Sequence, residues 1–501
     1  MAFRGITKLF VTQTRFSQLS TLSYKRLTDN DVEILSKIVE GSIITNTDDL
    51  ETYNTDWMRR CNAKSKLVLK PNSTQKVSQI LSYCNQERIA VVPQGGNTGL
   101  VGGGVPMDSN EIILSLSKMN KVIEFEPSLG VLTCEAGCVL ENLDRYLEKF
   151  GHCVPLDLGA KGSCQIGGNV STNAGGLRLL RYGSLRGNVL GIEAVLADGT
   201  IIDCMSSLRK DNTGYDIKQL FIGSEGTLGV ITKIALLAPI KPAYKNVAMF
   251  SCHTYEDLLQ ALSLAKSRLG EIVSALEFID YEAMLVVNQH LDLKCPISLA
   301  PFFFFIETSG SNQEHDRQKL DEYLEEVYGK ALVTDGTVAE DSSKAAYIWG
   351  LRERQVEAGV RVGWIYKYDL SLPLNCLYEL VQETRKRCKG LASYTVSYGH
   401  LGDSNLHLNV YNTHYTQELK DTIEPFVFEW TASRGGSISA EHGMGFDKAK
   451  YIYFSKQKES VEIMRQLKRR FDPNGILNPN KTVLLDDSKC IRPPPIGKYN
   501  H

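Results

Sequence analysis

The sequence predicts an α+β protein of two or three domains, and three observations support this prediction. The chain has 501 residues, which is too long for one hydrophobic core. Its first part alternates short apolar segments, helical patterns and glycine-rich loops, whereas the part after residue 241 mixes strands with amphipathic helices. Residues 393–410 alternate apolar and polar side chains around a turn, which predicts a β-hairpin.

The composition excludes several classes of partner. The formal net charge is -2, so nothing indicates binding to nucleic acid or to an anionic membrane. The most apolar run, residues 300–306 with four consecutive phenylalanines, is far too short for a membrane span and fits a buried strand. The 12 cysteines form no Cys-x-x-Cys pair, and we expect them to be reduced thiols in an intracellular compartment.

The first 28 residues differ in kind from the rest. They contain arginines, lysines, serines and threonines, and the first acidic residue is Asp29. This composition predicts a mitochondrial transit peptide over 1–28, with a disordered basic tail as the alternative. The segment is left out of the fold prediction.

The elements expected before residue 100 lead into the first glycine-rich loop. They are a helix over 29–39, a linker over 55–61, a strand over 67–69, a helix over 73–86 and a strand over 89–92. The loop that follows, 93–104, contains six glycines in twelve residues. It lacks the Gly-Lys-Ser/Thr of a P-loop, and no Gly-x-Gly-x-x-Gly follows a strand, which argues against a nucleotide P-loop and a Rossmann NAD site.

Two further loops are rich in small residues, around 162–176 and 221–229. One glycine-rich loop alone is more often a flexible connection than a ligand site. Three such loops, each after an apolar segment, could together wrap one long cofactor, because backbone amides without side chains allow close approach of a diphosphate.

The predicted hairpin carries candidate metal ligands. His400 enters the turn and His407 leaves it, so both rings can face one space, and Asn409 shares the face of His407. Glu441 and His442 follow in a glycine-flanked loop. Two histidines and a carboxylate with a further histidine are the ingredients of an open zinc or manganese site. On spacing alone, two histidines seven residues apart are more often unrelated.

The motifs resemble those of a known flavoprotein family. Pro93-Gln-Gly-Gly-Asn-Thr-Gly, Gly167-Gly-Asn-Val-Ser-Thr-Asn-Ala-Gly-Gly and Gly223-Ser-Glu-Gly-Thr-Leu-Gly resemble the FAD-binding loops of the vanillyl-alcohol oxidase and p-cresol methylhydroxylase family. Gly399-His-Leu-Gly-Asp-Ser-Asn-Leu-His and Glu441-His-Gly-Met-Gly resemble the C-terminal half of its D-2-hydroxy-acid dehydrogenases. The resemblance runs from about Asp56 to Lys481.

The resemblance implies an α+β fold: a two-subdomain FAD-binding domain of p-cresol methylhydroxylase type, an α+β substrate (cap) domain and a C-terminal helical segment. The implied boundaries are 29–61 for an N-terminal helical segment, 62–241 for the FAD-binding domain, 242–455 for the substrate and metal domain, and 456–501 for a segment that completes the FAD site. Within the substrate domain, 302–307 and 364–372 are expected strands and 312–328 an expected helix.

The resemblance also implies bound FAD. No histidine lies in the first loop, so we expect the flavin to be non-covalent. The implied cofactor-binding residues are Pro93, Gly95, Gly96, Asn97, Thr98, Gly99, Asp157, Gly168, Asn173, Gly223, Glu225, Gly226, Thr227 and Asn480.

The implied catalytic site combines a divalent metal, zinc above all, with a general base. His400, His407 and Glu441 would bind the metal, and His442 would accept the hydroxyl proton of the substrate. The implied substrate-binding residues are Arg352, Lys367, Asn409 and His442. Two cations beyond the metal favour a substrate with a second carboxylate, 2-hydroxyglutarate over D-lactate, with 2-oxoglutarate as product.

Two departures from the family pattern and several alternatives remain at this point. Val356 stands where relatives commonly have threonine, and Asn480 stands where they commonly have glycine. The alternatives are a D-lactate dehydrogenase, a metal hydrolase without flavin and a non-catalytic flavin-binding protein. Family and compartment imply the mitochondrial matrix as location and electron-transfer flavoprotein as electron acceptor.

Overall fold

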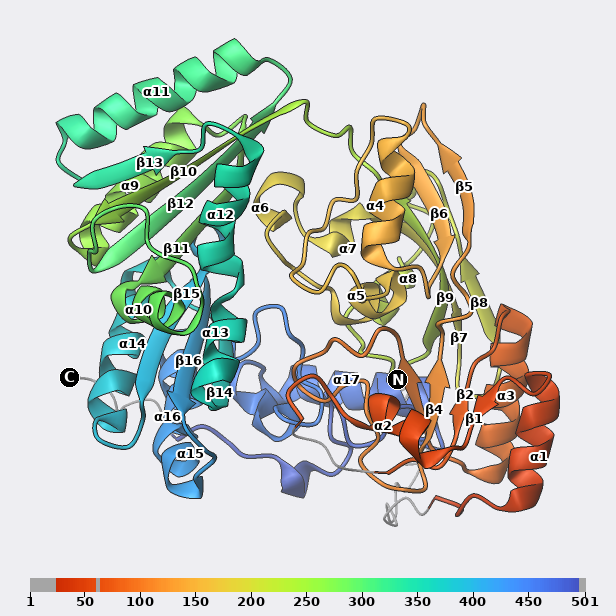
Figure 1. The fold of residues 1–501 in the computed structure, drawn as a ribbon. Helices are drawn as coiled ribbons and strands as arrows, with labels where there is room; N and C mark the ends of the chain where they lie inside the picture. Colours follow the sequence, from red (N-terminus) through yellow and green to blue (C-terminus); the bar gives the residue numbers. More distant parts are fainter. Residues whose placement is uncertain (1–23, 60–63, 495–501) are drawn as a thin grey trace, which may run out of the picture.

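The computed structural model describes residues 24–59 and 64–494, and Figure 1 shows their arrangement. The predicted transit peptide lies outside this part of the chain apart from residues 24–28, so it stays a prediction. Three β-sheets form the frame, and the helices cover them.

The first sheet has four strands in the order β1-β2-β4-β3. Strands β2, β4 and β3 are parallel, and β1 joins antiparallel. The bounds of the strands and nearby helices are α1 (Asp29–Ile38), β1 (Ile43–Ile44), α2 (Thr47–Asn54), β2 (Val68–Leu69), α3 (Thr74–Glu87), β3 (Val91–Gln94) and β4 (Ile112–Ser115).

Two elements near the first glycine-rich loop show how well local pattern sets the bounds. The helix expected over 73–86 is α3, which starts where the Ser73 side chain accepts the amide hydrogen of Lys76. The strand expected to stop at Val92 continues as β3 through Pro93. Because β3 is the outer strand of its sheet, a proline without an N–H is tolerated there.

The second sheet has five antiparallel strands in the order β5-β6-β9-β7-β8. It shares one hydrophobic core with the first sheet, since both contribute side chains such as Leu114 and Ile192 to the same cluster. The bounds are β5 (Val122–Glu126), β6 (Val131–Glu135), α4 (Leu140–Glu148), α5 (Ile166–Thr172), α6 (Leu179–Tyr182), α7 (Leu185–Asn188), β7 (Val189–Val195), β8 (Ile201–Cys204), α8 (Lys218–Phe221) and β9 (Val230–Leu237).

The third sheet has seven antiparallel strands in the order β13-β10-β12-β11-β15-β16-β14. It forms the opposite half of the molecule from the two smaller sheets in Figure 1. The strands are β10 (Tyr244–Cys252), β11 (Val273–Asp280), β12 (Phe302–Gly310), β13 (Asp335–Val338), β14 (Trp364–Ser371), β15 (Tyr394–His400) and β16 (Asn405–Asn412).

Helices cover both faces of the seven-stranded sheet. The four phenylalanines of β12 show this directly: Phe302 and Phe304 pack in one core cluster, and Phe303 and Phe305 pack in the cluster on the other face. The expected buried strand is therefore confirmed. The helices are α9 (Tyr255–Arg268), α10 (Tyr281–His290), α11 (Gln313–Gly329), α12 (Ser342–Glu353), α13 (Gln355–Val362), α14 (Leu374–Cys388), α15 (Gln417–Ile423) and α16 (Phe426–Ser433).

The C-terminal segment returns to the first half of the molecule. It contains the helix α17 (Lys458–Phe471) and the 3₁₀ helix η3 (Asp487–Lys489). The 3₁₀ helix η2 (Ala449–Phe454) comes just before this segment and still packs against the seven-stranded sheet. Residue Leu477 pairs with Val91 at the edge of β3, where the amide of Asn478 donates to the Val91 carbonyl at 2.8 Å. Buried Lys468 of α17 also donates to the carbonyls of Thr227 and Leu477.

In the part of the chain that the structure describes, no helix has both the length and the apolar character needed to cross a membrane. The described cysteines are all free thiols, as expected from their scattered spacing.

Candidate active site

The predicted hairpin is confirmed and brings two histidines together. Strands β15 and β16 pair antiparallel and are joined through the short 3₁₀ helix η1 (Leu401–Asp403) and Ser404, which has a φ of 67°. The ring centres of His400 and His407 lie 5.3 Å apart. The alternation of β16 also places Asn409 on the face of His407, because side chains two residues apart share one face of a strand.

Three imidazole rings converge on one carboxylate oxygen of Glu441. The Nε2 atoms of His400 and His407 lie 3.6 Å from Glu441 Oε1, and that of His442 lies 3.7 Å from it. Ligand atoms in a tetrahedral zinc site with bonds of about 2.1 Å are about 3.4 Å apart. These spacings therefore suit a shared divalent cation better than direct hydrogen bonds.

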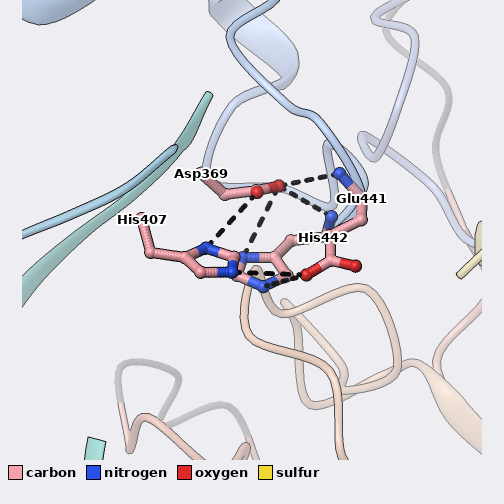
Figure 2. Close-up of side chains that lie close together, drawn as sticks. All are labelled: Asp369, His407, Glu441 and His442. Atoms are coloured by element: carbon pink, nitrogen blue, oxygen red, sulfur yellow. Dashed lines mark hydrogen bonds and ion pairs between the residues drawn. The ribbon is translucent and has the colours of Figure 1, made fainter. Parts of the chain in front are cut away.

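A second carboxylate, Asp369 of β14, lies on the other side of two of these rings (Figure 2). Its Oδ2 accepts the backbone amides of Glu441 and His442 at 2.9 and 2.8 Å. It lies 3.6 Å from His442 Nδ1, and Oδ1 lies 3.7 Å from His407 Nδ1. Potential ligand atoms of Asp369, His407, Glu441 and His442 all fall within 4.8 Å of one another.

The sequence assigns no role to Asp369. The signal that identifies it is strand register: β14 pairs with β16 so that Asp369 lies opposite His407 and Lys367 lies opposite Asn409. The sequence alone does not reveal this pairing, because 33 residues, 372–404, lie between the two strands.

Burial and charge set the protonation of these groups before any metal binds. Burial opposes charge on the His400 ring, but the carboxylates of Glu277 and Glu441 outweigh this effect and raise the pKa of His400. Burial lowers the pKa of His407 and of His442. The two rings are therefore neutral near pH 7, which suits a metal ligand and a proton acceptor respectively.

The predicted substrate residues gather around a side chain that the sequence did not single out, Tyr398. The guanidinium of Arg352 lies 4.9 Å from the centre of its ring, and Lys367 Nζ lies 5.9 Å from that centre and 3.5 Å from the hydroxyl. Asn409 donates to the Tyr398 hydroxyl at 2.9 Å, whereas its buried Oδ1 has no hydrogen-bond partner within the described part.

The two cations differ in their surroundings. Arg352 is paired with buried Glu277 through Nε at 2.9 Å and Nη2 at 2.8 Å. No carboxylate of the described residues forms an ion pair with Lys367, whose tip contacts only Tyr398. Arg352 therefore already has an ion-pair partner inside the protein, and Lys367 has none among the described residues. That the two side chains bind substrate stays a prediction.

A cavity of about 620 Å³ leads from the glycine-rich loops to the metal-site residues. Glu441, His442 and Val356 line it, whereas the other expected metal and substrate residues do not: His400, His407, Arg352, Lys367 and Asn409. The cofactor-binding residues expected from the sequence that line this cavity are Pro93, Gly95, Gly96, Asn97, Thr98, Gly99, Gly168, Glu225 and Gly226.

The cavity lining fits a large polar ligand. Gln165 Oε1 and Asn169 Oδ1 are buried without a hydrogen-bond partner in the described part, although both residues line the cavity. A Cβ on Gly99 or Gly168 would meet no atom within 4 Å, so the backbone there is open to a ligand. Gly96 is glycine because the space beside it is filled: an added Cβ would lie 2.0 Å from the Ser163 carbonyl oxygen.

Five of the expected cofactor residues do not line this cavity. Asp157 pairs with Arg178 and Lys161 instead, and the Asn173 side chain accepts from Ser184 and the Arg186 amide. Their cofactor-binding role stays a prediction, as it does for Gly223, Thr227 and Asn480.

Glu225 joins the cofactor loops to the metal-site loop. Its buried carboxylate accepts the backbone amides of Met444 and Gly445, both at 2.8 Å. Because these residues directly follow His442, the side chain fixes the loop that carries Glu441 and His442. This role was not expected from the sequence, which predicted Glu225 only as a cofactor residue.

Comparison with known proteins agrees with this geometry. A family described as FAD binding domain matches residues 65–205, and one described as FAD linked oxidases, C-terminal domain, matches 241–482. The protein named mitochondrial D-2-hydroxyglutarate dehydrogenase in Danio rerio is 54% identical over 462 residues, which cover 92% of this chain and 86% of that protein. This chain belongs to the D-2-hydroxyglutarate dehydrogenase family. The family resemblance predicted from the motifs is thus confirmed.

The same comparisons include a related name and a shared fold. A mitochondrial protein of Schizosaccharomyces pombe that carries the name of a D-lactate dehydrogenase is 48% identical over 480 residues, 92% of this chain and 91% of that protein. The structure of p-cresol methylhydroxylase with substrate bound superposes with a TM-score of 0.73 at 14% identity, covering 90% of this chain and 96% of that one. The expected fold class is therefore confirmed.

Proposed function

We propose that this chain is an FAD-dependent dehydrogenase that oxidises D-2-hydroxyglutarate to 2-oxoglutarate at a metal site beside the flavin. The observation that carries the proposal is the convergence of three imidazole Nε2 atoms on Glu441 Oε1, a residue that also lines the cavity of the FAD-binding loops. Neither a metal hydrolase nor an inert flavin-binding protein has a use for both features together.

FAD, when bound, supplies the acceptor for the two electrons that leave C2 of the substrate. The loop 93–99 would hold its diphosphate, and Gly168 and Gly226 would line the rest of the cofactor. We expect the flavin to be bound without a covalent link, because no histidine lies in the first loop.

A zinc ion, when bound, supplies a Lewis acid for the hydroxyl and the neighbouring carboxylate of the substrate. We assign its ligands to His400 Nε2, His407 Nε2 and Glu441 Oε1, because each nitrogen lies 3.6 Å from that oxygen, close to the ligand spacing of a tetrahedral site. Asp369 is better suited to hold the loop of Glu441 and His442 in place than to bind the metal, because its Oδ2 already accepts their backbone amides.

His442 is the proposed general base. Burial keeps its ring neutral, and its Nδ1 faces the Asp369 carboxylate at 3.6 Å. A proton on Nδ1 leaves the Nε2 lone pair on the side of Glu441 and the cavity, where it can accept the hydroxyl proton.

Metal dependence can be tested apart from flavin binding. His407→Ala, or removal of the metal with a strong chelator, should abolish turnover and leave the flavin absorbance spectrum unchanged. Turnover by metal-free protein at the wild-type rate would contradict the proposed mechanism. His414→Ala is a matched control at an exposed histidine outside the site, and it should keep both metal and turnover.

The second carboxylate of the substrate is assigned to Lys367. Arg352 is already balanced by Glu277, whereas Lys367 has no carboxylate partner among the described residues. A substrate that leaves this half-buried cation unpaired should lose at most roughly 3–5 kcal/mol, the cost for a fully buried charge, or at most about a hundred- to thousandfold in kcat/KM. Lactate has one carboxylate, so this penalty would fall on lactate.

The test is kcat/KM for D-2-hydroxyglutarate and D-lactate in wild type, Lys367→Ala and Arg352→Ala. Wild type should strongly prefer the diacid, and Lys367→Ala should narrow that preference. Arg352→Ala should impair both substrates alike, because it leaves Glu277 unpaired. Equal turnover of both substrates by wild type would instead support a D-lactate dehydrogenase, the alternative favoured by the name of the S. pombe relative.

The proposal extends to compartment and electron acceptor. The mitochondrial location expected from the N-terminal composition agrees with the names of the relatives. We propose electron-transfer flavoprotein as the acceptor, and reduction of this protein by substrate-reduced enzyme in a stopped-flow experiment would test it.

A further inference from the structure

Glu277 lies in β11, at the centre of the seven-stranded sheet, and its side chain is 2% exposed. In the register of the sheet it stands opposite His400 of the hairpin. Its two oxygens have different partners: Oε1 lies 2.8 Å from His400 Nδ1, and Oε2 lies 2.8–2.9 Å from the Nη2 and Nε atoms of Arg352. One buried carboxylate thus contacts both a proposed metal ligand and a proposed substrate residue.

The contact with His400 determines which ring nitrogen faces the metal site. When His400 loses a proton to bind metal, a hydrogen kept on Nδ1 and donated to Glu277 leaves Nε2 as the free lone pair. Nε2 is the atom that lies 3.6 Å from Glu441 Oε1. A carboxylate behind a metal-binding histidine fixes the ring orientation and makes the ligand nitrogen more basic.

The contact with Arg352 fixes a long side chain against the Tyr398 ring, 4.9 Å from its centre. An arginine held through two of its nitrogens by a carboxylate loses most of its rotational freedom before the substrate arrives. Its remaining N–H groups are then free to bind substrate from a defined position.

We propose that Glu277 is a positioning residue that prepares the metal ligand His400 and the substrate-binding Arg352 through one carboxylate. The inference rests on the proposed function, because it assigns Glu277 to the metal and substrate sites of that reaction. It predicts that one substitution weakens metal binding and substrate binding together, although Glu277 touches neither ligand.

Glu307 provides a matched control. It lies on the adjacent strand β12, is also buried, and is also paired with an arginine, Arg178. It contacts Ser274 and Trp349 but none of the metal-site residues. Glu307→Gln therefore makes the same chemical change to a buried, arginine-paired glutamate away from the site.

The experiment compares Glu277→Gln with Glu307→Gln in the purified FAD-bound protein. Zinc affinity is measured by competition with a chromophoric chelator, and KM and kcat for D-2-hydroxyglutarate are measured at saturating zinc. Glu277→Gln should weaken zinc binding by about 10- to 100-fold and should raise KM, whereas Glu307→Gln should keep wild-type zinc affinity. Both variants should keep the flavin spectrum.

Two results would overturn the proposal: wild-type zinc affinity in Glu277→Gln, or an equal loss of zinc affinity in Glu307→Gln. If Glu277→Gln does not fold, Glu277→Asp replaces it, because the shorter carboxylate keeps the charge but cannot reach both partners. It should still lose zinc affinity, and wild-type affinity in this variant would overturn the proposal. Failure of the proposed function would be distinct, since wild type itself would then bind no zinc or oxidise no hydroxy acid.

Discussion

At the scale of single residues, Asp369 shows how one side chain can organise a site without reaching the substrate. It is fully buried, and it accepts from two backbone amides and from Asn405. Burial raises the pKa of a carboxyl group, but the nearby rings and Lys448 outweigh this effect and lower the pKa of Asp369. Its oxygens lie 3.7 and 3.6 Å from the Nδ1 atoms of His407 and His442, too far for direct hydrogen bonds. The ionised carboxylate still favours a hydrogen on each Nδ1, which leaves the Nε2 atoms on the side of Glu441.

Asp403, in the turn of the hairpin, is the opposite case. Burial raises the pKa of Asp403 to about 6, although His400 partly opposes the shift. An unfolded aspartate has a pKa of about 3.9, so ionisation of Asp403 opposes folding. This destabilisation of the folded state is absent below about pH 4 and reaches its full size somewhat above about pH 6.

Asp403→Asn should therefore stabilise the metal-free protein in a pH-dependent manner. We expect a gain of about 1–2 kcal/mol at pH 8, less than the full shift implies because the side chain is partly exposed, and almost none at pH 4. Melting temperatures of both proteins, measured by fluorescence across this range, test the expectation. A gain of the same size at both ends would mean that the effect is not electrostatic.

At the scale of elements, the sequence predicts those helices and hairpins whose bounds depend on the local apolar period and on turn residues. The hairpin with His400 and His407 follows from alternation around Gly402-Asp-Ser-Asn, and the helix α3 follows from its cap and its apolar spacing. The contributions of Glu277 and Tyr398 do not follow, because they depend on which strands become neighbours. Strand order in a sheet is a property of tertiary packing, which no local pattern contains.

The loop after His442 depends on a glycine that has two separate constraints. Gly443 has a φ of +82°, and a Cβ there would lie 2.9 Å from Glu225 Cδ. Gly435 has a similar φ of +69°, but a Cβ there would meet nothing within 4 Å. A side chain at either position would strain the backbone by about 1–2 kcal/mol, because φ is positive. Only at Gly443 would the side chain also collide with Glu225.

Gly443→Ala and Gly435→Ala should accordingly lose similar stability but differ in activity. Gly443→Ala displaces the loop that carries the proposed base, so its kcat should fall by about 10- to 100-fold. Gly435→Ala should keep its kcat. Melting temperature and kcat measured on both variants decide the matter, and equal kcat values would show that Glu225 moves away without disturbing His442.

At the scale of the whole molecule, the fold class was predictable because the glycine-rich motifs occur in a fixed order along the chain. The contacts that hold the two halves together were not, since they join residues far apart in sequence. Arg178, between α5 and α6, pairs with Asp157 at 3.3 Å within its own half. It also pairs closely with Glu307 of β12 in the other half.

This ion pair is nearly dry, with 12% of the Arg178 side chain and 3% of the Glu307 side chain exposed. Arg178→Met would leave Glu307 buried with only neutral donors, Ser274 and Trp349. Removal of one partner of a buried pair costs about 3–5 kcal/mol, whereas replacement of both partners costs far less. The melting temperature of the FAD-bound protein should therefore fall sharply in Arg178→Met and recover in Arg178→Met/Glu307→Gln.

Arg145→Met serves as the control, because its ion pair with Glu141 is exposed to solvent and should contribute less than about 1 kcal/mol. If the two halves are held together mainly by apolar contacts, Arg178→Met will melt close to wild type and the double variant will show no recovery. If the ion pair between Arg178 and Glu307 holds the two halves together, Arg178→Met should also release FAD at a lower temperature than wild type.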